Sequence, residues 1–200
     1  MTKEEIIAIV QKTYSFLNPQ ELELLWMQAE YQKCANREII IHKGERSQKS
    51  FFILKGLVRG YIYTPKGEEK NLFLRPEHTL TGAPDTLFEG VATKYTFEAV
   101  LETHLLVFNF PQIEQLSSEM ISIARIYIES LKENLQTLLF RVESLVYMTP
   151  EERYEALLKR SPQFFQTAFN KHIANYLGIT PVSLSRIIKR RQEAEKRLDN

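Results

Sequence analysis

The stretch Asn170-Lys-His-Ile-Ala-Asn-Tyr-Leu-Gly-Ile-Thr-Pro-Val-Ser-Leu-Ser-Arg-Ile-Ile-Lys189 decides the fold at the end of the chain. Its apolar residues recur at helical spacing on either side of Gly178, which predicts two short helices joined by a tight turn with a positive φ at that glycine. Thr180 suits an N-cap and Pro181 the first position of the second helix. The pattern is typical of a helix-turn-helix.

The two predicted helices each have an inner face. The residues that we expect to be buried are Ile173, Ala174, Leu177, Leu184, Ile187 and Ile188. The outer face of the second helix then presents Val182, Ser185 and Arg186, followed by the basic run Lys189 to Arg191, while His172 is expected at the surface. An ordinary helical hairpin would explain the apolar spacing alone. The small residue, glycine turn, Thr-Pro cap and outward Ser and Arg together favour DNA binding.

Composition limits the possible classes of protein. The 200 residues carry a net charge of only +1, with 44% hydrophobic residues and one cysteine, Cys34. One cysteine excludes an internal disulfide framework, and the sequence contains neither a signal peptide nor an apolar run of about 20 residues, so we expect a cytoplasmic protein without a membrane partner. From Ser161 onward, seven basic residues outnumber three acidic ones, which is typical of phosphate binding by one end of a chain.

The pattern of apolar and turn-forming residues changes twice along the chain. Residues 3–33 look helical, with Asn18-Pro19 starting a second helix, and residues 38–110 then alternate short apolar runs with turns. The expected strands are 38–42, 51–54, 57–63, 71–74, 95–101 and 105–108, which predicts an antiparallel β-sandwich or roll. Thr149-Pro150 caps a further helix that ends at Arg160.

Residues 117–148 show a regular helical period. The seam residues lie at alternating spacings of three and four: Ile121, Ala124, Ile128, Leu131, Leu135, Leu138, Val142 and Leu145. Such heptads favour a parallel homodimer, although the stripe could instead pack on the chain's own β domain. Four further apolar residues lie off the seam, so the helix could do both: Ile123, Ile126, Leu139 and Val146.

The order of these parts resembles the Crp–Fnr superfamily of bacterial transcription regulators. The residues that carry the resemblance are Ser50 to Arg59 in the expected sheet, Glu152-Arg-Tyr154 with Leu157-Leu-Lys159, and Ile173 to Arg186. The resemblance implies an α+β fold with a jelly-roll-like β-roll sensor domain (residues 1–116), a dimerisation helix (117–148) and a helix-turn-helix domain (149–200). It also implies double-stranded DNA with an inverted repeat as partner, a homodimer, and RNA polymerase as a further candidate partner.

Nucleotide-binding members of that family carry a Gly-Glu pair followed by Arg and a small hydroxyl residue. Here Gly82 matches, but Ala83 stands in place of the glutamate, and Thr93-Lys94 in place of Arg-Ser. Alanine cannot accept a hydrogen bond from ribose, and lysine lacks the planar fork that binds phosphate bidentately. We therefore expect no response to cyclic AMP. The candidate effector pocket comprises Gly82, Ala83, Thr93, Lys94, Tyr61 and Phe73, with Phe52 and Phe97 as further apolar candidates; the effector itself is unknown.

No cofactor or metal is predicted. An iron–sulfur form needs several cysteines, and no spacing singles out Cys34, His42, His78 or His104 as haem or metal ligands. The scattered histidines also argue against an enzyme built on the β-roll.

For DNA, we expect four residues to face the bases: Arg186, Ser185, Val182 and Pro181. Arg186 would bind guanine, and Val182, which replaces an acidic residue of well-known members, would touch a thymine methyl. The expected phosphate contacts are Lys171, Thr180, Ser183, Lys189 and Arg190, and no sequence remains after the second helix for the β-hairpin wing of many relatives. The alternative function is a small-molecule-binding module whose C-terminal helices dock a partner protein.

Overall fold

The computed structural model describes residues 1–198, so the last two residues of the predicted C-terminal domain lie outside the described residues, as do the side chains of Thr167, Glu195, Arg197 and Leu198. The fold is α+β, as predicted. The helices are α1 (Lys3–Thr13), α2 (Pro19–Met27), α3 (Pro84–Glu89), α4 (Phe110–Glu119), α5 (Ile121–Tyr147), α6 (Pro150–Arg160), α7 (Gln163–Thr167), α8 (Asn170–Leu177) and α9 (Pro181–Leu198). The strands are β1 (Ala29–Cys34), β2 (Ile39–Ile41), β3 (Lys49–Lys55), β4 (Leu57–Tyr63), β5 (Glu69–Pro76), β6 (Leu80–Gly82), β7 (Thr96–Ala99) and β8 (Thr103–Asn109).

The strands form two antiparallel sheets, ordered β1-β8-β3-β6 and β2-β7-β4-β5. Alternating apolar side chains from both sheets meet between them, and the fully buried members include Phe51, Ile53, Phe97 and Leu105. The sequence predicted the β-roll from short apolar runs separated by turn residues, and in the structure successive residues of these runs face opposite sides of the sheet.

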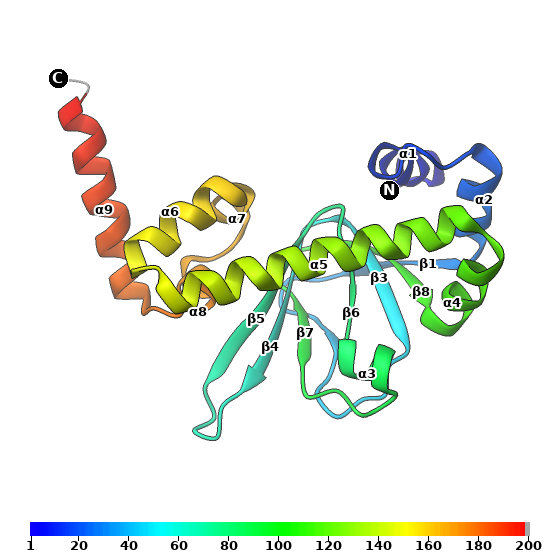
Figure 1. Ribbon diagram of the computed structural model, residues 1–200, viewed down its shortest axis with the longest axis horizontal. Coiled ribbons are helices and arrows are strands. Elements are labelled where there is room, and N and C mark those ends of the chain that lie inside the picture. The colour runs from blue at the N-terminus through cyan, green and yellow to red at the C-terminus, as the bar shows by residue number, and fades with distance from the viewer. Residues whose placement is uncertain (199–200) are drawn as a thin grey trace.

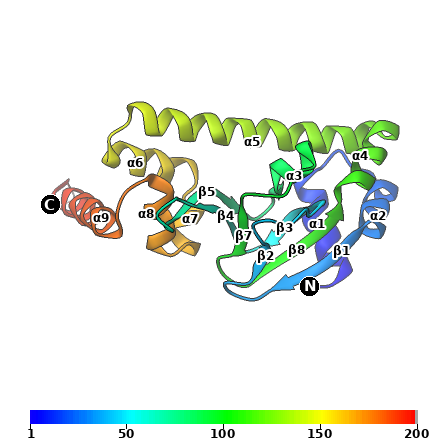
Figure 2. The same cartoon turned by 90° about the horizontal axis from the view of Figure 1, so that it is seen from below.

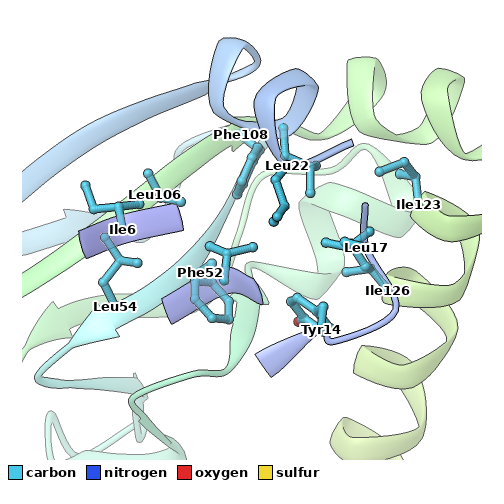
Figure 3. Packing of buried hydrophobic residues seen from close by; sticks show 12 residues of the cluster. Ile6, Tyr14, Leu17, Leu22, Phe52, Leu54, Leu106, Phe108, Ile123 and Ile126 are labelled. Carbon is cyan, nitrogen blue, oxygen red and sulfur yellow. The ribbon is translucent and has the colours of Figure 1, made fainter. Parts of the chain in front are cut away.

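A second apolar layer lies on the other side of the first sheet. Side chains from α1, α2, β3, β8 and the start of α5 meet there, as Figure 3 shows for Tyr14, Phe52, Phe108 and Ile126. Capping boxes start both N-terminal helices, with Thr2 paired to Glu5 and Asn18 to Glu21. The N-terminal helices are therefore part of the roll's own core.

Two predicted boundaries were wrong. Residues 29–34 are not helical: they form β1, because all six pair with β8 from Ala29–Phe108 to Cys34–Thr103, and sheet pairing overrides the local preference. The long helix also does not start at residue 117. Ser117 and Ser118 end α4 with hydroxyls that donate to carbonyls three residues back, and Met120 is extended before α5 begins. The elements β6, α3, α4 and α7 were not predicted as separate elements.

Helix α5 links the two ends of the molecule. It runs along the β-roll and reaches the C-terminal helices at its far end (Figure 1). In the view of Figure 2 it forms one edge of the molecule, with the β-roll and the C-terminal helices on its other side. Ile123 and Ile126 are buried against the roll, whereas Leu139 and Val146 are exposed. One side of α5 thus packs on its own chain and another side faces away from it.

The C-terminal helices share a core with the second sheet. Leu57, Leu74 and Val100 of the roll join one apolar cluster with Leu157 of α6 and Ile173 of α8. Thr149 caps α6 as predicted, in a capping box with Glu152. The helical end is therefore packed against the roll rather than joined to it only through α5.

Candidate nucleic-acid interface and ligand pocket

The turn between α8 and α9 has the predicted geometry. Gly178 adopts a left-handed conformation with φ of 71° and donates its amide to Ala174 and Asn175. The hydroxyl of Thr180 accepts from the Ser183 amide at 3.1 Å, which confirms the predicted N-cap. The turn is stabilised locally, so the angle between the two helices is set by the chain itself.

The inner and outer faces of this helical pair separate clearly. The buried side chains include Ile173, Ala174, Leu177, Leu184 and Ile187, and Ile188 is half-buried. His172 is buried as well, contrary to the expectation of a surface residue, because α8 packs against β5. Desolvation, and then the charges of Arg59 and Lys171, lower the pKa of His172 to about 4.

The outer face of α9 is open. Val182 is 61% exposed, and Pro181, Ser185 and Arg186 are exposed beside it. Among the described residues, Arg186 has neither a hydrogen bond nor a salt bridge. Thr180 and Lys171 are also exposed, and Ser183 is half-buried. The predicted base-reading residues thus lie on one accessible surface.

The basic run that follows is partly paired within the chain. Arg190 approaches Glu151 of α6 at 3.0 Å and Arg191 approaches Glu155 at 3.4 Å. Lys189 lies 3.8 Å from Glu193. These are exposed ion pairs, each worth at most about 1 kcal/mol, so they can exchange for another anion.

Polar contacts fix α8 to the sheet. The Asn71 amide donates to the side chain of Asn175, the Asn175 side chain donates to the Glu69 carbonyl, and the Asn71 side chain donates to the His172 carbonyl. Arg141 of α5 donates to the carbonyls of Asn71 and Tyr176, both at 2.7 Å. Sequence reasoning missed this joint, because its partners lie up to 106 residues apart.

Arg59 is the buried charge beneath this joint. Its guanidinium pairs with Glu98 and Glu69, both at 2.6 Å, and donates to Asn71. It also lies 4.0 Å from the ring centre of Tyr61. Both carboxylates raise the pKa of Arg59 against the opposing effect of burial, so this arginine is charged and both its terminal nitrogens are paired, although its Nε atom has no partner.

A hydrogen bond between Asp85 and Lys94 joins the two ends of the loop from Gly82 to Lys94. Ala83 is fully buried and starts α3 without a side-chain cap. The Asp85 carboxylate accepts from the amides of Thr86 at 3.0 Å and Lys94 at 2.8 Å. The Lys94 side chain is exposed and lies over the Tyr95 ring. The Asp85 carboxylate therefore already accepts the hydrogen bond of the Lys94 amide, at the position where the sequence predicted an anion.

A cavity of about 390 Å³ lies between the roll and α5. Gly82 and Phe73 line it, but Ala83, Thr93, Lys94 and Tyr61 do not, so the structure brings together only two of the six predicted pocket residues. Other lining residues come from α3, α4 and α5, among them Leu87, Phe110, Ile123, Tyr127 and Asn134. Sequence reasoning also missed Arg75, which lines this cavity from β5.

The predicted seam residues are largely accessible. Ile121 is 90% exposed, and exposed fractions of 40–58% hold for Ile128, Leu131, Leu135, Leu138, Val142 and Leu145; Ala124 is half-buried. Leu131, Leu135 and Leu138 also line one side of the cavity. The exposed seam residues from Ile121 to Leu145 thus form an apolar band along α5.

None of the helices in the described part of the chain has the length and apolarity needed to cross a bilayer. Cys34 is buried, and burial raises the pKa of its thiol to about 11. His104 is also buried and bonds to Tyr31, whereas His42 and His78 are exposed. In the described residues, no three His, Cys, Asp or Glu side chains gather as a metal site.

Comparison with known proteins defines the class of the β-roll. Residues 31–119 match the family model of the cyclic nucleotide-binding domain. No curated protein matches the chain by sequence.

Most of the chain shares its fold with solved bacterial proteins, among them a putative transcriptional regulator of the Crp/Fnr family from Eubacterium rectale, which is 18% identical with a TM-score of 0.67 over 90% of this chain and 86% of its own. FixK2 from Bradyrhizobium japonicum is 17% identical, with a TM-score of 0.73 over 84% of this chain and 86% of its own. The c-di-GMP-responsive global regulator CLP from Xanthomonas campestris is 13% identical, with a TM-score of 0.70 over 89% and 93%. Thermus thermophilus catabolite activator protein is 18% identical, with a TM-score of 0.55 over 92% and 87%. At these identities the likeness shows the fold alone.

Proposed function

We propose that this chain is a dimeric, sequence-specific DNA-binding transcription regulator of the Crp–Fnr type that does not respond to cyclic AMP. The observation that carries the proposal is the outer face of α9, where Arg186 is exposed without a partner among the described residues on a helix whose inner face is buried. The exposed face of this second helix carries short and basic side chains. In a helix-turn-helix, such a face fits the major groove of DNA.

The proposed contacts divide into two kinds. Arg186 reads guanine through O6 and N7, Ser185 and Val182 contact neighbouring bases, and Pro181 contributes shape. Lys171, Thr180, Ser183, Lys189 and Arg190 bind phosphates. Arg190 must first leave Glu151, which makes its net contribution the smallest of the basic contacts.

The proposed dimer forms through the exposed band of α5. Leucines and valines that are half-exposed along several helical turns are typical of an interface rather than of a free surface. In a parallel pair of α5 helices these residues would interlock, and the two α9 helices would enter major grooves about 34 Å apart.

The closed loop supports the absence of a cyclic AMP response. The Asp85 carboxylate would repel a phosphate at the Lys94 amide, and the buried methyl group of Ala83 offers no acceptor for ribose. We expect calorimetric titration with cyclic AMP or cyclic GMP to give no heat, and micromolar binding would contradict this part of the proposal.

The DNA part of the proposal is tested by selection from randomised duplexes with the purified ligand-free protein at fixed moderate salt. We expect enrichment of one inverted repeat with half-sites a helical turn apart. Salt-sensitive retention without enrichment would contradict sequence-specific reading by the ligand-free protein. No retention even at low salt would favour the alternative, a ligand-binding module whose C-terminal helices dock a partner protein.

A further inference from the structure

Arg75 is a buried cation that no carboxylate of the described residues contacts directly, although the charge of Glu133 acts on it. Its side chain is 5% exposed, and its Nε atom is buried without a hydrogen-bond partner. Within the described residues, its guanidinium forms neither a hydrogen bond nor a salt bridge, and it lies 5.4 Å from the centre of the Phe73 ring. Burial lowers the pKa of Arg75. Leaving a buried charge unpaired is costly, so proteins ordinarily give it a partner.

Arg59 shows what this fold does with a structural arginine. It lies on the neighbouring strand of the same sheet and is also 5% exposed, yet two carboxylates and one amide oxygen bind its guanidinium. The two residues differ in surroundings rather than in depth. Arg59 is beneath the α8 joint, whereas Arg75 lines the cavity between the roll and α5.

The lining of that cavity points to an amphipathic ligand. Among the described residues that line it, Arg75 alone is charged, and most of the others are aliphatic or aromatic, among them Phe73, Leu87, Phe88 and Tyr95. Ser130 and Asn134 of α5 add neutral polar groups. A volume of about 390 Å³ is within the range of small-molecule pockets.

Glu133 of α5 acts on Arg75 through its charge but makes no direct bond to it. Glu133 lines a second cavity of about 300 Å³, shared with Arg75 and with Arg160 of α6, and it forms no salt bridge with either arginine among the described residues. That second cavity is more polar, and it lies between the roll, α5 and the C-terminal helices. The two cavities therefore offer two distinct environments on either side of one guanidinium.

We propose that the cavity between the roll and α5 binds an organic carboxylate with an apolar body, its carboxylate held by Arg75 and its body packed against the aromatic and aliphatic lining. The occupant is an anionic small molecule rather than a nucleotide. Its role as the effector rests on the proposed function, because the same cavity is lined by Leu131, Leu135 and Leu138 of the proposed dimer seam. A ligand there would contact the sensor and the seam together.

The proposal is tested by calorimetry on the purified full-length protein with octanoate and with 1-octanol, which share an apolar chain and differ in charge. We expect octanoate to bind at least tenfold more tightly than 1-octanol. Arg75→Met should reduce octanoate affinity at least tenfold and leave that of 1-octanol unchanged. Arg160→Met, which removes a cation that lines only the second cavity, should change neither affinity.

Several results would overturn the proposal. Equal affinity of the wild-type protein for octanoate and 1-octanol would exclude an anion anchor, and this comparison does not depend on whether a variant folds. Loss of octanoate binding in Arg160→Met, with binding kept in Arg75→Met, would move the anion to the second cavity. Arg75-dependent binding of inorganic phosphate, with neither octanoate nor 4-phenylbutyrate bound, would exclude the apolar body. All titrations are done without DNA, so a failed duplex selection leaves this test intact, and enriched duplexes do not rescue a failed titration.

Discussion

The loop from Gly82 to Lys94 and the outer face of α9 are the two regions that the family resemblance marks for binding, and they differ in how their polar groups are used. In the loop, Asp85 of the same chain satisfies the amides of Thr86 and Lys94. On α9, Arg186 and Ser185 point away from the molecule, with Arg186 unpartnered among the described residues. In the loop, a carboxylate of the same chain satisfies these backbone amides. On α9, the exposed polar side chains remain available to a partner molecule.

Because of this difference, we expect substitutions in the two regions to change different properties: the stability of the fold in one region and binding in the other. Substitution of Asp85 in the loop should lower the free energy of unfolding, because amide donors would lose their acceptor. Substitutions on the open face of α9 should leave stability within about 0.5 kcal/mol and change only what the protein binds. Substitutions in the exposed apolar band of α5 should likewise change binding rather than stability. The four predictions below test this division.

The largest effect is expected at the α5 band. Val142→Glu places a charge in the C-terminal part of the proposed seam, and we expect the dimer to dissociate and affinity for a two-half-site duplex to fall about a hundredfold or more. Sedimentation velocity and a DNA titration measure the two effects. Gln136→Glu adds the same charge at an exposed position outside the band and should change neither. A monomeric wild-type protein, or a Val142→Glu variant that remains dimeric, would contradict the seam.

Arg186→Ala should remove base discrimination. The loss of a bidentate arginine–guanine contact is worth about 1–3 kcal/mol, or about 5- to 150-fold, between the selected duplex and one with a changed guanine. The matched variant Lys189→Ala should weaken all duplexes alike and reduce the salt slope by about one. Equal, sequence-independent losses in the two variants would contradict the assignment of Arg186.

Asp85→Ala should destabilise the protein by about 1–3 kcal/mol, because the buried amide of Thr86 and the partly buried amide of Lys94 lose a charged acceptor. Urea unfolding measures this change. Glu89→Ala, at an exposed position of the same helix, serves as control and should stay within about 0.5 kcal/mol of the wild type. If Asp85→Ala were as stable as the wild type, the loop would not be closed in the way described.

The smallest effect concerns pH. His172 is neutral in the folded protein, because its pKa is lowered to about 4, first by burial and then by Arg59. The unfolded chain therefore binds the additional proton between about pH 6.5 and 4, and stability should fall as the pH drops through that window. Urea unfolding at several pH values should show that His172→Gln loses this part of the dependence. His42→Gln, at an exposed site, should retain it; the same slope in wild type and His172→Gln would contradict the burial argument.

Local signals predicted the elements that depend on local chemistry. The glycine turn at Gly178, the Thr180 cap and the apolar strands could be read because a single φ, a single hydroxyl or a two-residue period defines each of them. The short strand at Leu80–Gly82 and the break at Met120 carry no such signal, since an apolar period continues through them. Strand β1 depends on its partner β8 rather than on its own residues.

The candidate sites divide in the same way. The outward direction of Val182 and Arg186 follows from helical periodicity, and their role in DNA reading stays a prediction. The cavity could not be predicted, because residues from six separate elements line it and because Arg75 has no neighbouring motif. The family pattern directed attention to Ala83 and Lys94, neither of which lines the cavity.

The reciprocal bonds between Asn71 and α8 have a consequence for the operator. Because α8 is bonded to β5 and the α8–α9 turn is stabilised locally, we expect α9 to change its position relative to the roll only if the bonds between α8 and β5 break. In the proposed dimer, the distance and rotation between the two recognition helices would then be set by the body of the protein. One inserted base pair rotates a half-site by about 34–36° around the duplex axis. A dimer with fixed recognition helices would bind duplexes with one spacer length between the half-sites and would not bind duplexes whose spacer is one base pair longer or shorter. The spacer length would then contribute to specificity without any contact between a side chain and a base.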